Sequence, residues 1–206
     1  MTSLELMSPK IRVMTVVGTR PELIRLATVI RKFDQEFDHF LLHTGQNSDP
    51  MLSDVFFSDL RLRQPDLYLG VDNSSLGSQL ADVISGTEVA IRDFKPDAMI
   101  VLGDTNSSMS AVIAKRMGVT VYHLEAGNRS FDSNVPEEIN RRIIDHLADF
   151  NLVYSEQARQ NLLLEGLHPR HVIKTGSPLR EIANEFSPLP ETDVLERLQL
   201  QSGKFI

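Results

Sequence analysis

Short, apolar runs rich in β-branched residues alternate along this chain with longer segments of helical periodicity. This alternation constrains the fold more than any other feature. The runs that fit buried strands lie at 11–17, 40–43, 98–102, 119–124, 151–154 and 171–174. The helical segments lie at 22–33, 76–94, 108–117, 137–148 and 156–165. Strands that alternate with helices pair in parallel through right-handed crossovers. The sequence therefore predicts an α/β fold, a Rossmann-like parallel sheet with helices on both faces.

Composition and charge exclude several classes of function. Hydrophobic residues make up 41% of the 206 residues, enough to build the core of one large α/β domain or two small ones. The net charge of -7 argues against a general nucleic-acid or acidic-membrane partner. Because the sequence has no cysteine, it excludes disulfides, thiolate nucleophiles and cysteine-based zinc sites. We find neither a secretory signal nor an apolar stretch of membrane-spanning length, so we expect a cytoplasmic protein.

The C-terminal part of the sequence has a different character. Pro178, Pro188 and Pro190 punctuate a connector, and Asp193–Leu200 fits one more helix. Gly203–Ile206 (GKFI) then begins what resembles a new strand, which would bury little by itself. We expect an N-terminal Rossmann-like domain over residues 1–177, then a connector and the start of a missing second domain over 178–206.

Each of five predicted strands is followed within a few residues by glycine. The segments are Gly18–Glu22 (GTRPE), Thr44–Asn47 (TGQN), Gly103–Asn106 (GDTN), Glu125–Arg129 (EAGNR) and Thr175–Ser177 (TGS). In open α/β sheets, ligands bind beyond the carboxyl ends of the strands. Glycine allows a close backbone approach or a positive φ there. One such glycine is explained by a tight turn, but five together with arginines and carboxylates indicate a ligand site.

The first of these segments favours two interpretations equally. Pro21 fits the first turn of a helix, where Glu22 complements the helix dipole. The segment is then either a simple helix cap or an anion site formed by Thr19 and Arg20 at the helix N-terminus. It lacks the further glycines of a dinucleotide fingerprint, and the chain has no P-loop motif, so a redox nicotinamide cofactor and a P-loop ATPase are disfavoured. No pair of histidines has metal-ligand spacing.

Carboxylates mark the ends of two neighbouring strands. Burial and mutual repulsion in one crevice would separate the pKa values of Asp104 and Glu125, which suits a general base and a general acid. Asp104 has a second interpretation as the cap of the next helix, whereas Glu125 has no capping role. Further along, Glu137 and Arg141 are four residues apart, so periodicity alone explains them as a surface ion pair. Glu138 and Arg142 form a second such pair.

Read together, these segments resemble the non-hydrolysing UDP-N-acetylglucosamine 2-epimerase family, over about Ile11–Ser177. The landmarks are GTRPE at 18–22, GDT at 103–105, HLEAG at 123–127, PEEINR at 136–141 and TGS at 175–177. The ordered set at these separations is highly specific, although each motif by itself is weak. The resemblance implies a glycosyltransferase-B-like fold of two Rossmann-like domains with the nucleotide sugar between them. This chain would supply the first domain.

The resemblance also implies a reaction and a set of site residues. Enzymes of this family are thought to expel UDP while removing the C2 proton, and then to re-add UDP to the 2-acetamidoglycal. By resemblance, Asp104, Glu125 and Glu137 match the catalytic carboxylates, with the roles of acid and base left open. The residues expected near the substrate, a UDP-2-acetamido sugar, are Gly18, Arg20, Arg25, Gln46, Asn128, Arg129 and Arg141. The scheme requires no cofactor and no metal, and family members are usually homodimers.

Departures from the common branch of the family bear on the sugar. Arg25 stands where that branch has lysine, Asn47 where it has histidine, and Val135 where it has tryptophan. The string EAGNRSFD at 125–132 is more similar to the branch that makes UDP-N-acetyl-L-fucosamine for capsule or O-antigen. Two other functions stay open, a glycosyltransferase-B-like sugar transferase and an inactive truncated sugar-binding domain.

Overall fold

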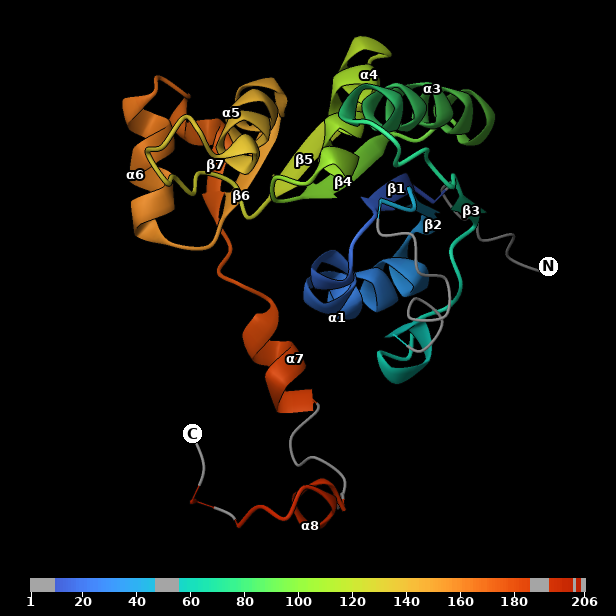
Figure 1. The fold of residues 1–206 in the computed structure, drawn as a ribbon. Coiled ribbons are helices and arrows are strands. Elements are labelled where there is room, and N and C mark those ends of the chain that lie inside the picture. The colour runs from blue at the N-terminus through green and yellow to red at the C-terminus, as the bar shows by residue number, and fades with distance from the viewer. Residues whose placement is uncertain (1–9, 47–55, 186–192, 202, 205–206) are drawn as a thin grey trace, which may run out of the picture.

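A single parallel sheet organises the molecule. The computed structural model describes residues 10–46, 56–185, 193–201 and 203–204. Its seven-stranded sheet has the order β3-β2-β1-β4-β5-β6-β7, and every neighbouring pair is parallel (Figure 1). The strands are β1 (Arg12–Val17), β2 (Asp38–His43), β3 (Leu67–Tyr68), β4 (Ala98–Leu102), β5 (Thr120–Leu124), β6 (Phe150–Val153) and β7 (Val172–Lys174). The predicted Rossmann-like sheet is confirmed.

Helices cover both faces of this sheet. The α-helices are α1 (Arg20–Glu36), α3 (Leu76–Phe94), α4 (Ser110–Arg116), α5 (Pro136–Leu147), α6 (Glu156–Leu164), α7 (Leu179–Glu185) and α8 (Val194–Arg197), with 3₁₀ turns η1 (Asn106–Met109) and η2 (Pro169–His171). Helices α3, α4 and α5 lie on one face and α1 on the other (Figure 1). The alternation of side chains along β1 divides the core accordingly, because Val13 and Val17 pack with α1 whereas Met14 and Val16 pack on the opposite face.

Local side-chain chemistry sets the ends of the helices. Ser75 begins α3 by accepting a hydrogen bond from the backbone N–H of Ser78, and Ser155 does the same for α6 with Ala158. Helix α3 ends at Lys95, which adopts a left-handed backbone conformation with φ of 51°. No helix among the described residues combines the length and apolar character needed to cross a membrane.

Strand β3 and helix α7 were not predicted from the sequence. Strand β3 has two residues, too few to show any periodicity. Helix α7 lies in the segment predicted to be a connector, where it packs against α1, buries Ile182 and forms an ion pair between Arg31 and Glu185. The helix predicted at Asp193–Leu200 is limited to the single turn of α8. Of the strand predicted at Gly203–Ile206, residues 205–206 lie outside the described part of the chain.

Candidate active site

A cavity of about 800 Å³ opens at the carboxyl edge of the sheet, where the sequence predicts a ligand site. We call it the carboxylate cavity. Four of the predicted site residues line it: Arg25, Gln46, Asp104 and Glu137. The rest of its wall comes from the loops after β1 and β4 and from α1, α3, η1 and α5, including Thr19, Glu22, Leu76, Leu80, Thr105, Asn106, Met109, Ile139, Asn140 and Ile143.

Glu22 ties two of the loops around this cavity together. Its buried carboxylate accepts hydrogen bonds from the backbone N–H groups of Gly18 and Thr19, both at 2.8 Å. It also accepts from the hydroxyl of Thr105, in the loop after β4, at 2.7 Å. Burial raises the pKa of Glu22, and the hydrogen bonds from Thr105, Gly18 and Thr19 oppose that rise. The capping interpretation of the GTRPE segment is thus confirmed as a capping box, while the link to Thr105 was not foreseen.

The protein itself requires a glycine at position 18. A Cβ at Gly18 would lie 1.9 Å from Oγ of Ser107 and 2.1 Å from Oγ1 of Thr44. These two hydroxyl oxygens lie 2.7 Å apart in a hydrogen bond. Ser107 also donates from its backbone N–H and its hydroxyl to Oε1 of Gln46, at 3.1 and 2.9 Å. Close packing therefore explains Gly18, and the same contacts orient Gln46 at the cavity wall.

Asp104 is held by helix α5. Its carboxylate forms an ion pair with Arg141, and its backbone carbonyl accepts a hydrogen bond from the side-chain amide of Asn140 at 3.0 Å. Asn140 also donates to Oδ1 of Asn106 at 2.9 Å. Thr105 occupies the N-cap position of the turn η1, so Asp104 does not take the capping role that its second interpretation gave it. Its carboxylate instead belongs to the cavity.

The two glutamates that open α5 have different surroundings. The predicted surface pair between Glu137 and Arg141 is wrong, because Arg141 turns to Asp104 and to Oε2 of Glu138, which lies 3.0 Å away. The predicted pair between Glu138 and Arg142 is confirmed, at 3.0 Å. Burial would raise the pKa of Glu138, but the backbone N–H of Ser130 and the Arg142 guanidinium together hold it below its ordinary value. Glu137 is left exposed on the cavity wall.

Glu125 does not line the cavity itself, and Arg25 connects it to the cavity. The backbone of Glu125 is left-handed, with φ of 62°, an uncommon conformation for a residue other than glycine. Its carboxylate forms an ion pair with Arg25, which itself lines the cavity. Burial raises the pKa of the neighbouring Tyr154 hydroxyl, and the charge of Glu125 raises it further. The structure thus joins Glu125 to Arg25, which lies one hundred residues earlier in the chain.

Of the predicted substrate-binding residues, Gly18, Arg20, Asn128, Arg129 and Arg141 do not line the cavity. Arg20 is exposed, with its guanidinium carbon 5.8 Å from the centre of the Phe56 ring. The backbone carbonyl of Asn128 accepts hydrogen bonds from Arg129 and Arg141, at 2.7 and 3.3 Å. The Arg129 side chain is fully buried between carboxylates and does not line the cavity. In this geometry Arg129 acts as a structural residue, which its sequence neighbours could not reveal.

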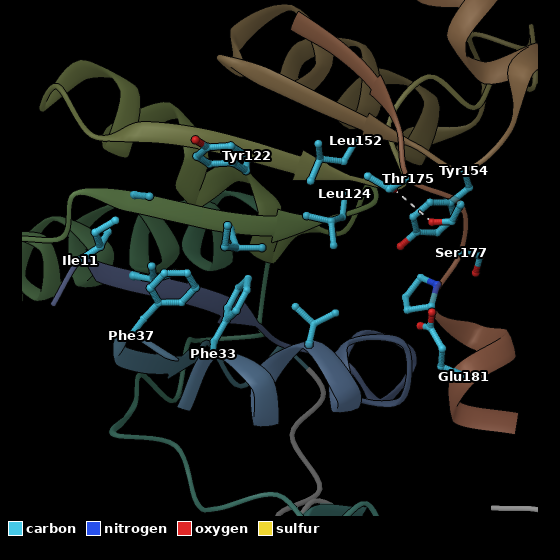
Figure 2. Close-up of a pocket in the computed structure, with 16 residues that line it drawn as sticks. Ile11, Phe33, Phe37, Tyr122, Leu124, Leu152, Tyr154, Thr175, Ser177 and Glu181 are labelled. Carbon is cyan, nitrogen blue, oxygen red and sulfur yellow. Dashed lines mark hydrogen bonds between the residues drawn. The ribbon is translucent and has the colours of Figure 1, made fainter. Parts of the chain in front are cut away.

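A second cavity, of about 510 Å³, lies on the α1 face of the sheet, and we call it the apolar cavity. Figure 2 shows Phe33 and Phe37 of α1 facing Tyr122, Leu124 and Leu152 of the sheet. Thr175, Ser177 and Glu181 close its other end (Figure 2). Glu181 is the only carboxylate among its described lining residues, so it lacks the paired acids of the first cavity.

Several residues of the carboxylate cavity were missed as site residues. Glu22, Asn140 and Ser107 orient its walls, and Glu22 and Asn140 sit inside motifs that the sequence analysis had singled out. Ser107 directly follows the GDTN segment, but nothing in the sequence distinguishes it from other serines. Within the described ranges, no group of three or more histidine, aspartate or glutamate side chains is arranged to hold a metal ion.

Comparison with known sequences identifies relatives of the chain. A family model described as UDP-N-acetylglucosamine 2-epimerase matches residues 31–204. The UDP-N-acetylglucosamine 2-epimerase of Methanocaldococcus jannaschii is 35% identical over 80% of this chain and 45% of its own. The UDP-2,3-diacetamido-2,3-dideoxy-D-glucuronate 2-epimerase of Pseudomonas aeruginosa is 31% identical over 85% of this chain and 51% of its own. The chain thus spans about half the length of these relatives.

Comparison with solved structures identifies similar proteins of the same family. The UDP-N-acetylglucosamine 2-epimerase of Rickettsia bellii is 45% identical, with a TM-score of 0.88 over 93% of this chain and 52% of that one. The M. jannaschii enzyme in complex with UDP-GlcNAc and UDP is 30% identical, with a TM-score of 0.85 over 91% of this chain and 53% of that one. The lipopolysaccharide galactosyltransferase WaaB, 12% identical with a TM-score of 0.56 over 79% of this chain and 44% of that one, shares the fold alone.

Proposed function

This chain belongs to the UDP-N-acetylglucosamine 2-epimerase family, and on that premise we propose that it is the N-terminal part of a UDP-sugar 2-epimerase. The enzyme would invert C2 of a UDP-linked 2-acetamido sugar. One observation carries the proposal: Asp104 and Glu137 line a single cavity at the carboxyl edge of the sheet, and Arg25 connects that cavity to Glu125.

The chemistry explains why several carboxylates are needed. The C2 proton lies beside an acetamido group rather than a carbonyl, so its direct removal would leave a poorly stabilised carbanion. In the proposed route, a carboxylate takes the C2 proton while the bond from C1 to UDP breaks, which forms the C1–C2 double bond of a 2-acetamidoglycal. UDP then re-adds at C1, and a carboxylic acid delivers a proton to the opposite face of C2. Such a route requires a base and an acid on opposite sides of the sugar.

Charged groups around the cavity suit the other demands of this route. The leaving diphosphate develops negative charge, which a nearby guanidinium stabilises. Arg25 is in the cavity wall, and Arg20 lies exposed at the N-terminal end of α1. Arg141 fixes the direction of the Asp104 carboxylate, and Gln46 is held by Ser107. We therefore assign Arg20, Arg25 and Gln46 to substrate binding and Arg141 to the orientation of Asp104.

The proposal also covers the identity of the sugar and the product for which it is made. The string EAGNRSFD at 125–132 favours a 6-deoxy 2-acetamido sugar made in the cytoplasm for a surface polysaccharide. The names of the relatives cover both UDP-N-acetylglucosamine and a diacetamido glucuronate, so substituents beyond C2 differ among them. A 6-deoxy substrate is consistent with that range.

We propose that the 206-residue chain supplies one wall of the substrate cleft, as a domain over residues 1–177 followed by the start of a second. With about half the length of its relatives, the chain alone would then show little or no turnover. We also propose a homodimer with helices of this domain at the contact. The exposed apolar side chain of Val89 on α3, which lies outside the carboxylate cavity, supports it.

Proton NMR in D₂O tests the reaction. The chain and the complete product of its gene are each incubated with UDP-N-acetylglucosamine and with the UDP-linked 6-deoxy-talose analogue. We expect deuterium at C2 together with the C2 epimer, and the preferred sugar identifies the branch. Absence of C2 exchange on both sugars would refute the proposal. UDP release that depends on an added acceptor would instead favour a sugar transferase, which needs no C2 proton transfer.

A further inference from the structure

A buried group of polar side chains joins the segments that carry the three proposed catalytic carboxylates. It consists of His123 in β5, Arg129 in the following loop, Asp145 in α5 and Glu165 at the end of α6, and we call it the buried cluster. The side chains of His123, Arg129 and Asp145 are fully buried. None of these four residues lines the carboxylate cavity, so the proposed reaction leaves the cluster unexplained.

His123 connects the cluster to the loop that carries Asp104. Its Nε2 lies 2.7 Å from the carbonyl oxygen of Gly103, the residue immediately before Asp104. A carbonyl oxygen only accepts hydrogen bonds, so Nε2 carries the hydrogen and donates it. A Cβ at Gly103 would meet nothing within 4 Å, so side-chain packing does not restrain that residue. The imidazole is therefore a direct restraint on the backbone that leads into Asp104.

Asp145 connects the cluster to the loop that carries Glu125. Its Oδ1 lies 2.9 Å from Nδ1 of His123, a close approach without the geometry of a hydrogen bond. The same oxygen accepts a hydrogen bond from the backbone N–H of Gly127 at 3.2 Å. Gly127, two residues after Glu125, is also held by Asn161, which donates to its carbonyl oxygen at 2.9 Å. Since Asp145 belongs to α5, whose second residue is Glu137, it links this helix directly to the Glu125 loop and, through His123, to the Asp104 loop.

Arg129 and Glu165 complete the cluster on the side away from Asp104. Arg129 donates to Asp145 at 2.7 Å and to both carboxylate oxygens of Glu165 at 2.7 and 2.6 Å. The hydrogen bonds from Arg129 lower the pKa of Glu165 to about 2. Glu165 contacts neither Gly103 nor Gly127, so it belongs to the same network without touching the carboxylate loops.

We infer that His123 and Asp145 are positioning residues, which fix the loops of Asp104 and Glu125 relative to each other and to Glu137. The catalytic part of this inference rests on the proposed epimerase function. Proton transfer to and from one carbon depends on placement, and a displacement of about 1 Å can cost about 100-fold in rate. A restraint on the backbone beside each carboxylate is a direct way to hold such placement.

Four variants of the complete gene product test the inference. His123→Leu removes both ring contacts, and His123→Gln keeps a donor that can reach the Gly103 carbonyl. Asp145→Asn keeps the shape and removes the charge. Glu165→Gln is the matched control, which weakens the same buried network at its far side. For each variant we measure kcat and KM for C2 deuterium exchange, the thermal midpoint, and the amide chemical shifts of residues 103–105 and 125–127.

We expect His123→Leu to lower kcat by about 100-fold with KM nearly unchanged, and His123→Gln to restore most of that loss. Amide shifts should move in both loops for His123→Leu and Asp145→Asn, and stay close to wild type for Glu165→Gln. Equal effects of His123→Leu and Glu165→Gln on kcat and on the shifts would overturn the inference. A wild-type protein without C2 exchange would refute the proposed function, and the amide shifts would then decide the positioning role by themselves.

Discussion

The carboxylate cavity and the apolar cavity share strand β4, yet they have opposite characters. Side chains from the middle of β4, β5 and β6 face the apolar cavity, among them Ile100, Tyr122 and Leu152. The carboxylate cavity begins where β4 ends, at Gly103 and Asp104. Within a strand, pairing fixes every second side chain against a helix-covered face, whereas beyond its end the backbone is free to turn and present polar groups. The volume of a cavity is therefore a weaker guide to chemistry than its place along the strands.

The strongest test of this contrast is the substitution Asp104→Asn. It keeps the side-chain volume but removes the charge that faces Arg141, and we expect the rate of C2 deuterium incorporation to fall by about 1000-fold. The measurement is the initial rate in D₂O with the complete gene product. Tyr122→Phe, in the apolar cavity, is the control and should leave the rate unchanged. Equal rates for Asp104→Asn and wild type would break the comparison.

A substitution in the apolar cavity should change the stability of the protein and leave the reaction rate unchanged. Ile100 is 6% exposed and packs in the core on the α1 face, so Ile100→Ala should lower the free energy of unfolding by about 2–4 kcal/mol. Urea denaturation measures this loss, and the C2 exchange rate per folded molecule should stay constant. A selective loss of rate with unchanged stability would place the apolar cavity in the reaction.

The stability of the protein should also depend on pH, through a histidine at the carboxyl edge of the sheet. Burial lowers the pKa of His43, at the end of β2, to about 4. Above pH 6.5 the imidazole is neutral in both the folded and the unfolded protein. Between pH 6.5 and pH 4 the unfolded chain binds a proton that the folded chain does not, so the free energy of unfolding decreases as the pH is lowered. The total loss in this window is roughly 3 kcal/mol.

His43→Asn isolates this contribution, because asparagine does not titrate and its oxygen can still accept the hydrogen bond that Nδ1 takes from the Gly45 backbone. Wild type and variant are compared by denaturation from pH 7.5 to pH 4. We expect the variant to be less stable at pH 7.5, since it loses the stacking on Tyr68, but to have a shallower slope. Parallel slopes would show that His43 titrates normally.

The smallest expected effect concerns close packing beside the carboxylate cavity. Gly18→Ala forces a Cβ against Ser107 and Thr44, and should lower the free energy of unfolding by about 1–3 kcal/mol. Gly77→Ala is the matched control, because its nearest neighbour would be 3.9 Å away and alanine suits a helix. Calorimetry of both variants should show a loss only for Gly18→Ala. A tolerated alanine at position 18 would mean that this edge of the sheet is less tightly packed than its contacts suggest.

Much of the architecture was predictable because its signals are local. Apolar runs located six of the seven strands, and the short β3 was missed because two residues show no period. The order of the strands around β1 follows from right-handed crossovers only after the elements are known. At the site, the strand-end motifs predicted a ligand cavity and contain Gln46 and Asp104 of its wall, whereas Arg25 and Glu137 were expected there from the family resemblance.

By itself, the sequence determined the α/β class and the edge of the sheet where polar groups gather, and it limited the GTRPE segment to a helix cap or an anion site. Only the tertiary structure decided the partners: Arg141 with Asp104 instead of Glu137, Arg25 with Glu125, and Arg129 buried against Asp145 and Glu165. The physical reason is the distance along the chain over which each interaction acts. Periodicity and capping act within a few residues, whereas an ion pair goes to whichever charge the folded backbone brings close, and burial then favours that pair over an exposed neighbour along the same helix.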